Sequence, residues 1–171
     1  MHEAERLAES GIAHLESAQY EKAAQDFASA LKLDPLSPEL FFNLGLAKLK
    51  AGRAKSAINH FEESLSLGGD NADLRSNLGL ALFETGKTKE AMASYQAALS
   101  MDPAHPEANN NMGVICFGQE QYSLAIDFFK AAIKSRPDYY DAWFNLRDTF
   151  AELGLEDEKL EADNIVKSLS V

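Results

Sequence analysis

An asparagine recurs along the chain at a constant interval, and its side chain is suited to binding a peptide backbone. The four residues are Asn43, Asn77, Asn111 and Asn145, each 34 residues from the next. An amide offers both a hydrogen-bond donor and an acceptor, so a row of amides can match the N–H and C=O groups of an extended peptide without reading its side chains. The alternative is that these amides bond to backbone groups of a neighbouring helix. The residue types alone leave both interpretations open.

The other chemically reactive side chains do not form a catalytic or metal-binding pattern. The four histidines are scattered without the spacing of a metal site, and Cys116 has no second cysteine with which to hold zinc. Cys116 is expected between helices, as a small buried apolar residue. The sequence also lacks a glycine-rich phosphate loop ending in Gly-Lys-Ser/Thr. We therefore expect no enzymatic activity, no cofactor and no bound metal.

The asparagines belong to an internal repeat. The segment 41–67 recurs at 75–101 and at 109–135, again at an offset of 34 residues. Within these segments glycine interrupts helical apolar spacing, although each glycine costs about 1 kcal/mol relative to alanine. The simplest common reason is close approach of two helices, with an aromatic residue of the facing helix beside each glycine. The glycines are Gly11, Gly45, Gly79 and Gly113, and the aromatic residues are Phe27, Phe61, Tyr95 and Phe129.

Turn and cap residues divide each repeat into a helical hairpin. Gly52 and Gly86 fall where the first helix should end. Prolines should end the second helix, because proline cannot continue a helix and disfavours helix in the preceding residue; these are Pro35, Pro103 and Pro137. Ser37 and Asn71 are suited to be N-caps of the helices that follow.

The pattern of small residue, alanine, aromatic residue, alanine and proline at this period resembles the tetratricopeptide repeat. The resemblance implies an all-α fold, a right-handed superhelical α-solenoid of antiparallel helix pairs, as a single array over residues 1–171. The expected repeats are 4–37, 38–71, 72–105 and 106–139, with a divergent C-terminal repeat at 140–171. In that last repeat Arg147 replaces the glycine and Asp163 the aromatic residue. Its second helix should act as an end cap with an apolar stripe of Leu160, Ala162, Ile165, Val166 and Leu169.

The resemblance also places the first helix of each repeat on a concave groove. The asparagine row should then lie in this groove, with Asn110 beside Asn111. Apolar residues at three recurring slots should form a strip next to the amides, and exposed apolar surface commonly marks an interaction site. The alternative is that several of them are core residues. The strip consists of Phe42, Leu46, Leu49, Leu80, Phe83, Val114, Phe117 and Phe144.

Composition limits the classes of partner. The formal net charge is −11, which argues against a nucleic-acid binder because neutralising phosphates requires clustered lysine and arginine. No apolar run is long enough for a membrane span, and the start of the chain has no secretory h-region. We expect a cytoplasmic location, with a removed leader or a longer parent protein as the alternative.

Together these observations predict a protein–protein interaction module that binds an extended peptide or partner segment in its groove. Two alternatives remain. One is a scaffold that assembles with further copies of itself, and the other is an accessory substrate-binding domain of a larger enzyme.

Overall fold

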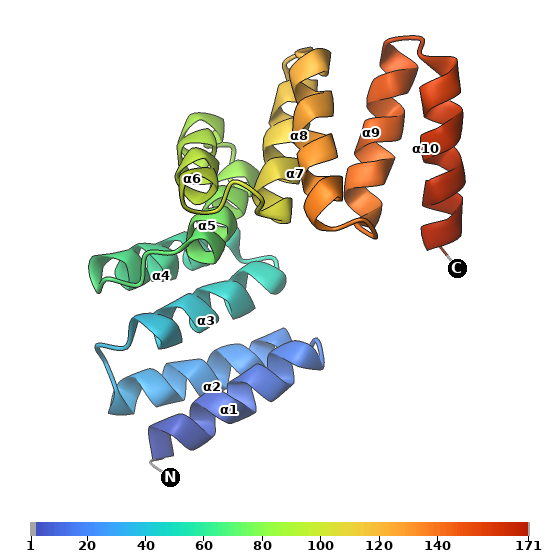
Figure 1. Cartoon of the computed structure of the whole chain (residues 1–171). Coiled ribbons are helices and arrows are strands. Elements are labelled where there is room, and N and C mark those ends of the chain that lie inside the picture. Colours follow the sequence, from blue (N-terminus) through green and yellow to red (C-terminus); the bar gives the residue numbers. More distant parts are fainter. Residues whose placement is uncertain (1–2, 171) are drawn as a thin grey trace. The chain divides into compact units, whose positions relative to one another are not determined.

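The computed structural model describes residues 3–170, and this part of the chain is all-α (Figure 1). Helices α1 to α10 follow one another with short turns and no strand between residues 3 and 170, which confirms the predicted class of helix pairs. Their bounds are α1 Glu3–Glu16, α2 Tyr20–Leu33, α3 Pro38–Lys50, α4 Ala54–Ser66, α5 Ala72–Glu84, α6 Thr88–Met101, α7 Pro106–Gly118, α8 Tyr122–Ser135, α9 Tyr140–Glu152 and α10 Glu156–Leu169.

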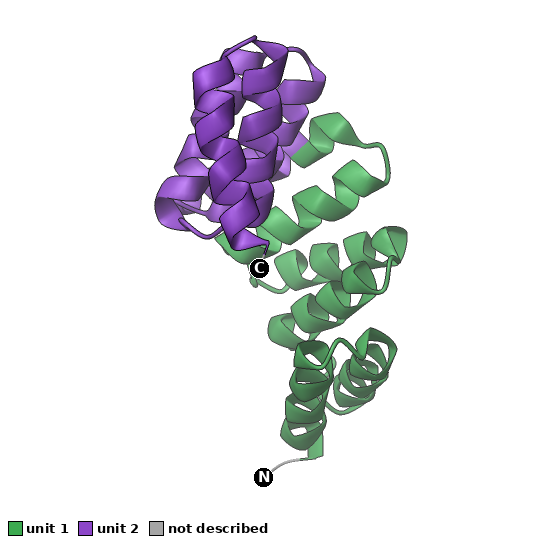
Figure 2. Ribbon diagram, turned by 90° about the vertical axis from the view of Figure 1, so that its right-hand side faces the viewer, with its two compact units in different colours: residues 1–91 green, residues 92–171 purple. Residues whose placement is uncertain are grey.

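The helices gather into two compact units, which Figure 2 distinguishes by colour. Unit 1 is Met1–Ala91 and unit 2 is Met92–Val171, so the division falls within α6. In unit 1, α1 packs against α2, α3 against α4, and α3 also contacts α1, α2 and α5. In unit 2, α7 packs against α8, and α9 packs against α7, α8 and α10. Within each unit, therefore, the first helices of successive hairpins are neighbours.

Caps and prolines set the helix bounds as predicted. The Ser37 side chain accepts a hydrogen bond from the Leu40 N–H at 3.2 Å, and Asn71 accepts one from the Leu74 N–H at 2.9 Å. His105 performs the same function for α7, where its Nδ1 accepts from Ala108 at 3.3 Å. Helices α2, α6 and α8 each end two residues before a proline.

The repeated glycines lie at close approaches between paired helices. A Cβ added to Gly11 would lie 2.7 Å from the ring of Phe27, and a Cβ on Gly45 would lie 2.7 Å from the ring of Phe61. In unit 2 the corresponding distance from Gly113 to the ring of Phe129 would be 2.5 Å. These distances are shorter than van der Waals contact, so only glycine fits, and the predicted packing is confirmed for these three hairpins.

The turn within each hairpin needs a left-handed backbone at one position. Gly52 and Gly86 occupy it with φ of +73° and +80°, which confirms their predicted role in ending the first helix. The equivalent residues of the first and fourth hairpins are not glycine: Ala18 has φ +55° and Glu120 has φ +60°. A left-handed conformation is unfavourable for residues with a Cβ, so these two turns are strained.

The last hairpin replaces the glycine–aromatic contact with charged residues. Arg147 takes the place of the glycine, and its Nη1 lies 3.8 Å from Oδ1 of Asp163, which takes the place of the aromatic residue. Ala162 and Val166 of α10 are buried, as the predicted stripe requires. Leu160, however, is 60% exposed, so its assignment to the stripe was wrong. It lies two residues before Ala162, and residues two apart do not share a helix face.

Candidate functional site

In unit 1 the predicted site residues gather on adjacent first helices. Phe42, Asn43 and Leu46 of α3 are partly exposed, as are Asn77 and Leu80 of α5, while Phe83 at the end of α5 is 37% exposed. Because α3 contacts α5, these six residues can form one surface, which we call the α3–α5 surface. The ring of Phe42 packs against the buried ring of Phe61, with centroids 6.0 Å apart, so the α3–α5 surface is in contact with the hydrophobic core.

The two amides of the α3–α5 surface differ in their hydrogen bonds. Asn77 Nδ2 donates to the carbonyl oxygen of Asp73, one turn earlier in α5, at 2.8 Å. This bond leaves the Asn77 side-chain oxygen as an acceptor. The Asn43 side chain makes no hydrogen bond to another residue between 3 and 170, so both its donor and its acceptor are available to a ligand.

Leu49 does not belong to this surface. It is only 5% exposed, so its prediction as a groove residue was wrong. Leu49 lies four residues after Gly45 and therefore shares the helix face that packs against α4. At the equivalent position of α5, Phe83 is 37% exposed.

In unit 2 an amide network joins the first helices α7 and α9. Asn145 Nδ2 of α9 donates to Oδ1 of Asn110 at 3.0 Å, and Asn110 Nδ2 contacts Oδ1 of Asn111 at 3.3 Å. Asn110 is only 5% exposed, which contradicts its prediction as a direct groove residue. It is covered because α9 packs against α7 at this position, and it orients the two partly exposed amides on either side of it.

A small pocket opens beside this network. Its volume is about 70 Å³, and it is lined by Val114 and Phe117 of α7, Phe129 of α8, and Asn145 and Asp148 of α9. Three of these five residues are predicted site residues. The pocket combines apolar walls with an amide and a carboxylate, so it can hold a small apolar group while hydrogen-bonding to the chain that carries it. With Asn111 and Phe144, these residues form the α7–α9 surface.

An arginine fixes the polar edge of the α7–α9 surface. The Arg147 guanidinium lies 4.0 Å from the centroid of the Phe144 ring, within the range of a cation–π contact. Its Nη2 and Nε donate to Oδ1 of Asp148 at 2.7 and 2.9 Å. Phe144 is 36% exposed, so the arginine holds an aromatic ring that a ligand can still reach.

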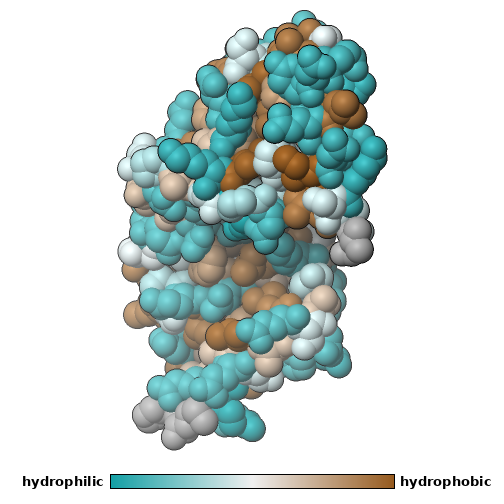
Figure 3. Space-filling model, turned by 45° about the vertical axis from the view of Figure 1, so that its right-hand side comes forward, coloured by the Kyte–Doolittle hydropathy of each residue, from teal (hydrophilic) through white to brown (hydrophobic). Residues whose placement is uncertain are grey.

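Asp148 and the contacts of Arg147 with Asp148 and Phe144 were not predicted from the sequence. The sequence did contain one indication, which is that position 147 is arginine where the other repeats have glycine. A long charged side chain cannot fit between two closely packed helices, so it must point away from the contact between the paired helices. Figure 3 shows that on the face in view hydrophobic residues reach the surface between hydrophilic ones.

Cys116 is a structural residue. It is 1% exposed in a core cluster with Phe129 and Leu146, and burial raises the pKa of its thiol. Among residues 3–170, no group of three or more His, Cys, Asp or Glu side chains is arranged to hold a metal ion. No helix in the same range is both long enough and apolar enough to cross a membrane.

Comparison with solved structures shows that similar architectures occur in several proteins. The crystal structure of MamA is 20% identical, with a TM-score of 0.76 over 94% of this chain and 94% of that chain. The Cut9–Hcn1 complex gives a TM-score of 0.89 at 20% identity, over 98% of this chain and 34% of that chain. YrrB, described as a tetratricopeptide repeat protein with an unusual peptide-binding site, gives 0.69 at 23% identity over 95% and 84% of the two chains.

At these identities the structural similarity shows the fold alone. A comparison with curated protein sequences found no match. The sequence profile of the tetratricopeptide repeat matches residues 9–73, 42–106 and 76–140, which together cover more than half of the chain. With the helix pairs and the glycine–aromatic contacts described above, these matches establish that the chain belongs to the tetratricopeptide repeat family.

Proposed function

We propose that this chain is a protein-interaction module that binds an extended segment of a partner protein through its first helices. The observation that carries the proposal is the α7–α9 surface, where an oriented amide pair, an apolar pocket and a reachable aromatic ring lie together. The α3–α5 surface offers the same types of group, with Asn43, Asn77 and Phe83. One groove through all repeats, and a cytoplasmic location, stay predictions.

The size of the pocket indicates which side chain it accepts. A cavity of about 150 Å³ holds a benzene ring, so a volume of about 70 Å³ suits a small apolar side chain such as that of alanine, valine or proline. Asn145 lies at the pocket wall, where its amide can bond to the backbone next to that side chain. The ligand is thus an extended segment with a small apolar residue, recognised mainly through its backbone. The peptide-binding site for which YrrB is described supports this use of the fold.

The test begins with peptides selected from a random library on the immobilised chain. Their affinity should then be measured for the wild type and for the double variant Asn111→Ala/Asn145→Ala. We expect a loss of about tenfold or more, which corresponds to about 1.4 kcal/mol. Asn164→Ala on α10 is the matched control, because Asn164 is exposed in the same unit and lies outside the α7–α9 surface. Methylating the peptide's backbone nitrogens next to its small residue should weaken binding as well.

Equal binding by the wild type and the double variant would refute the proposal. The double variant also removes both hydrogen-bond partners of the buried Asn110, so we expect it to lose about 1–3 kcal/mol of stability, and binding should be compared well below its unfolding transition. Light scattering addresses the alternative of self-assembly: a stable oligomer that selects no peptide would favour a scaffold built from copies of the chain.

A further inference from the structure

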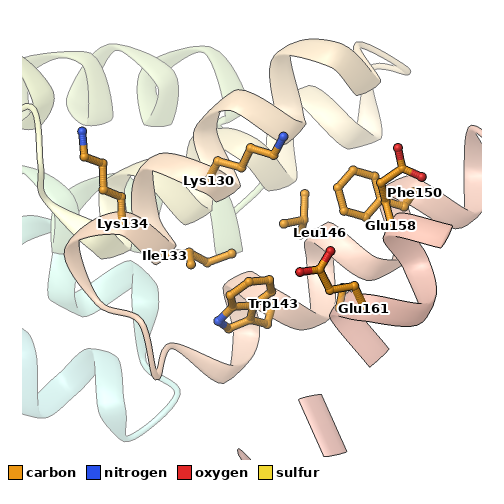
Figure 4. Close-up of a pocket in the computed structure, with 9 residues that line it drawn as sticks. Lys130, Ile133, Lys134, Trp143, Leu146, Phe150, Glu158 and Glu161 are labelled. Carbon is orange, nitrogen blue, oxygen red and sulfur yellow. The ribbon is translucent and has the colours of Figure 1, made fainter. Parts of the chain in front are cut away.

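A second and larger pocket in unit 2 has a chemistry unlike that of the two amide surfaces. Its volume is about 360 Å³. Its walls come from the second helices α8 and α10, and its floor comes from α9, which packs against both (Figure 4). The residues that line it are Lys130, Ile133, Lys134, Trp143, Leu146, Phe150, Glu158, Glu161 and Ala162. We call it the α8–α10 pocket.

The floor of this pocket is apolar and aromatic. Trp143, Leu146 and Phe150 come from α9, and Ile133 adds to it from α8. A cavity of about 150 Å³ accommodates a benzene ring, so this pocket has room for about two large apolar side chains. Two such side chains one turn apart are what the apolar face of an amphipathic helix presents.

The two rims carry opposite charges. Lys130 and Lys134 stand one turn apart on α8, whereas Glu158 and Glu161 stand about one turn apart on α10, across the apolar floor (Figure 4). None of these four side chains forms an ion pair with any residue between 3 and 170, although Lys159 and Lys167 of α10 both do. The rims thus present two rows of charge that an incoming segment can match.

The polar groups of the pocket do not suit an extended peptide. An extended peptide needs partners for its own backbone N–H and C=O groups. The lining contains no amide side chain, and helices α8, α9 and α10 use their backbone groups internally. A helix satisfies its own backbone hydrogen bonds and needs only apolar contacts and complementary charges, both of which this pocket supplies.

We propose that the α8–α10 pocket docks an amphipathic helix of a partner protein. The helix inserts two large apolar side chains between α8 and α10. It carries acidic residues on the flank that faces Lys130 and Lys134, and basic residues on the flank that faces Glu158 and Glu161. This site is separate in place and chemistry from the amide surfaces, so the chain can hold an extended segment on its first helices and a helical segment here.

The single tryptophan of the chain provides a direct readout. Trp143 is the one tryptophan in the sequence, it lines this pocket, and its indole N–H donates to the carbonyl oxygen of Pro137 at 2.8 Å. The probe is a synthetic amphipathic helical peptide of 14 residues, the length of α10, with a leucine face, one glutamate flank and one lysine flank. We expect saturable binding that changes the Trp143 emission. A control peptide of the same composition, with the leucines out of helical register, should bind at least about tenfold more weakly, or about 1.4 kcal/mol.

Charge reversal on the exposed rim tests the role of the charges. Lys130→Glu/Lys134→Glu should weaken binding of the mixed-charge peptide about tenfold, again about 1.4 kcal/mol. The same variant should bind a peptide with lysine on both flanks more tightly than the wild type does. Glu158→Gln/Glu161→Gln provides an independent variant in case the reversal disturbs folding, which far-UV circular dichroism would reveal. It should weaken the mixed-charge peptide while leaving the helical content unchanged.

Four outcomes of the peptide-binding experiments would overturn the proposal. These are equal binding of the in-register and out-of-register peptides, tighter binding of a proline-containing extended peptide, insensitivity of binding to both rim variants, and an unchanged Trp143 emission at saturation. A concentration-dependent mass in light scattering that the rim variants abolish would assign the pocket to a second copy of the chain and would also overturn it. Asn111→Ala/Asn145→Ala separates this site from the proposed function, because that variant should leave binding of the helical peptide unchanged.

Discussion

Replacing Gly113 with alanine should destabilise unit 2, although alanine is the better helix former. The added Cβ would lie 2.5 Å from Cε1 and 2.7 Å from Cδ1 of Phe129. Phe129 is 1% exposed within a core that includes Ala125 and Leu146, and the small pocket that it lines on the α7–α9 surface is the space next to its ring, so the ring can relieve the contact only in part. Overpacking of this kind costs about 1–3 kcal/mol, and the helix propensity of alanine offsets up to about 1 kcal/mol. We expect a net loss of about 1–2 kcal/mol.

The assay is urea unfolding followed by the emission of Trp143, which lies in the same unit. With a denaturant slope of about 2 kcal/mol per molar urea, within the usual range, the transition midpoint should fall by roughly 0.5–1 M. Gly118→Ala is the matched control: Gly118 ends the same helix, and nothing lies within 4 Å of its added Cβ. That variant should be neutral or slightly stabilised.

Phe129→Leu should rescue part of the loss caused by Gly113→Ala, because a smaller side chain leaves room for the new methyl group. The two substitutions would then be non-additive, as expected for residues in contact. A Gly113→Ala variant as stable as the wild type, with a transition of unchanged slope, would refute the close-approach explanation of the glycine row.

Three further substitutions test other parts of the fold by the same unfolding assay. Glu120→Gly should stabilise the chain by about 1 kcal/mol, because φ of +60° is unfavourable with a Cβ, and an unchanged midpoint would contradict this. Asn71→Ala should cost about 1 kcal/mol by removing the cap bond to the Leu74 N–H, whereas Asn71→Ser should cost less. Burial and the nearby Lys48 lower the pKa of His60, so below about pH 6.5 the unfolded chain binds a proton that the folded chain does not. The stability from neutral His60 is complete above that pH and is lost as the pH falls through the folded pKa. In the His60→Gln variant the urea midpoint should therefore decline less steeply as the pH is lowered. An equally steep decline in both proteins would exclude His60 as the cause.

The helix pairs were predictable because their determinants recur locally. The glycine–aromatic contact, the cap residues and the terminal prolines each depend on residues within one repeat. Each pattern alone is weak evidence for a helical hairpin, but its recurrence at the same interval makes the prediction strong. Gly45 and Phe61 illustrate this, since their spacing of 16 residues is the same as that of Gly11 and Phe27. Where the period fails, as at Arg147, the sequence could mark the departure but could not give the contacts that replace the lost one.

The burial of individual site residues was less predictable, because residues at equivalent positions of different repeats differ in exposure. Leu49 and Phe83 occupy equivalent positions, yet Leu49 is 5% and Phe83 37% exposed. Asn110 has no special spacing of its own, and its burial follows from the packing of α9 against α7. Such differences arise from contacts between neighbouring repeats, which a periodic pattern within one chain does not specify.

The asparagine row shows why equal residues at an equal period need not have equal functions. Asn77 bonds to its own helix, Asn145 bonds to Asn110 of the neighbouring helix, and Asn43 makes no hydrogen bond to another residue between 3 and 170. Neither bond is to a backbone group of a neighbouring helix, which was the alternative interpretation, and peptide binding by the row stays a prediction. A ligand bond to Asn43 displaces no bond within the protein, and a ligand bond to Asn77 or Asn145 can use the side-chain oxygen or the second N–H of the amide. Since an amide NH2 has two N–H groups, Asn77 and Asn145 each keep one donor beside the oxygen, whereas Asn43 keeps both donors and the oxygen.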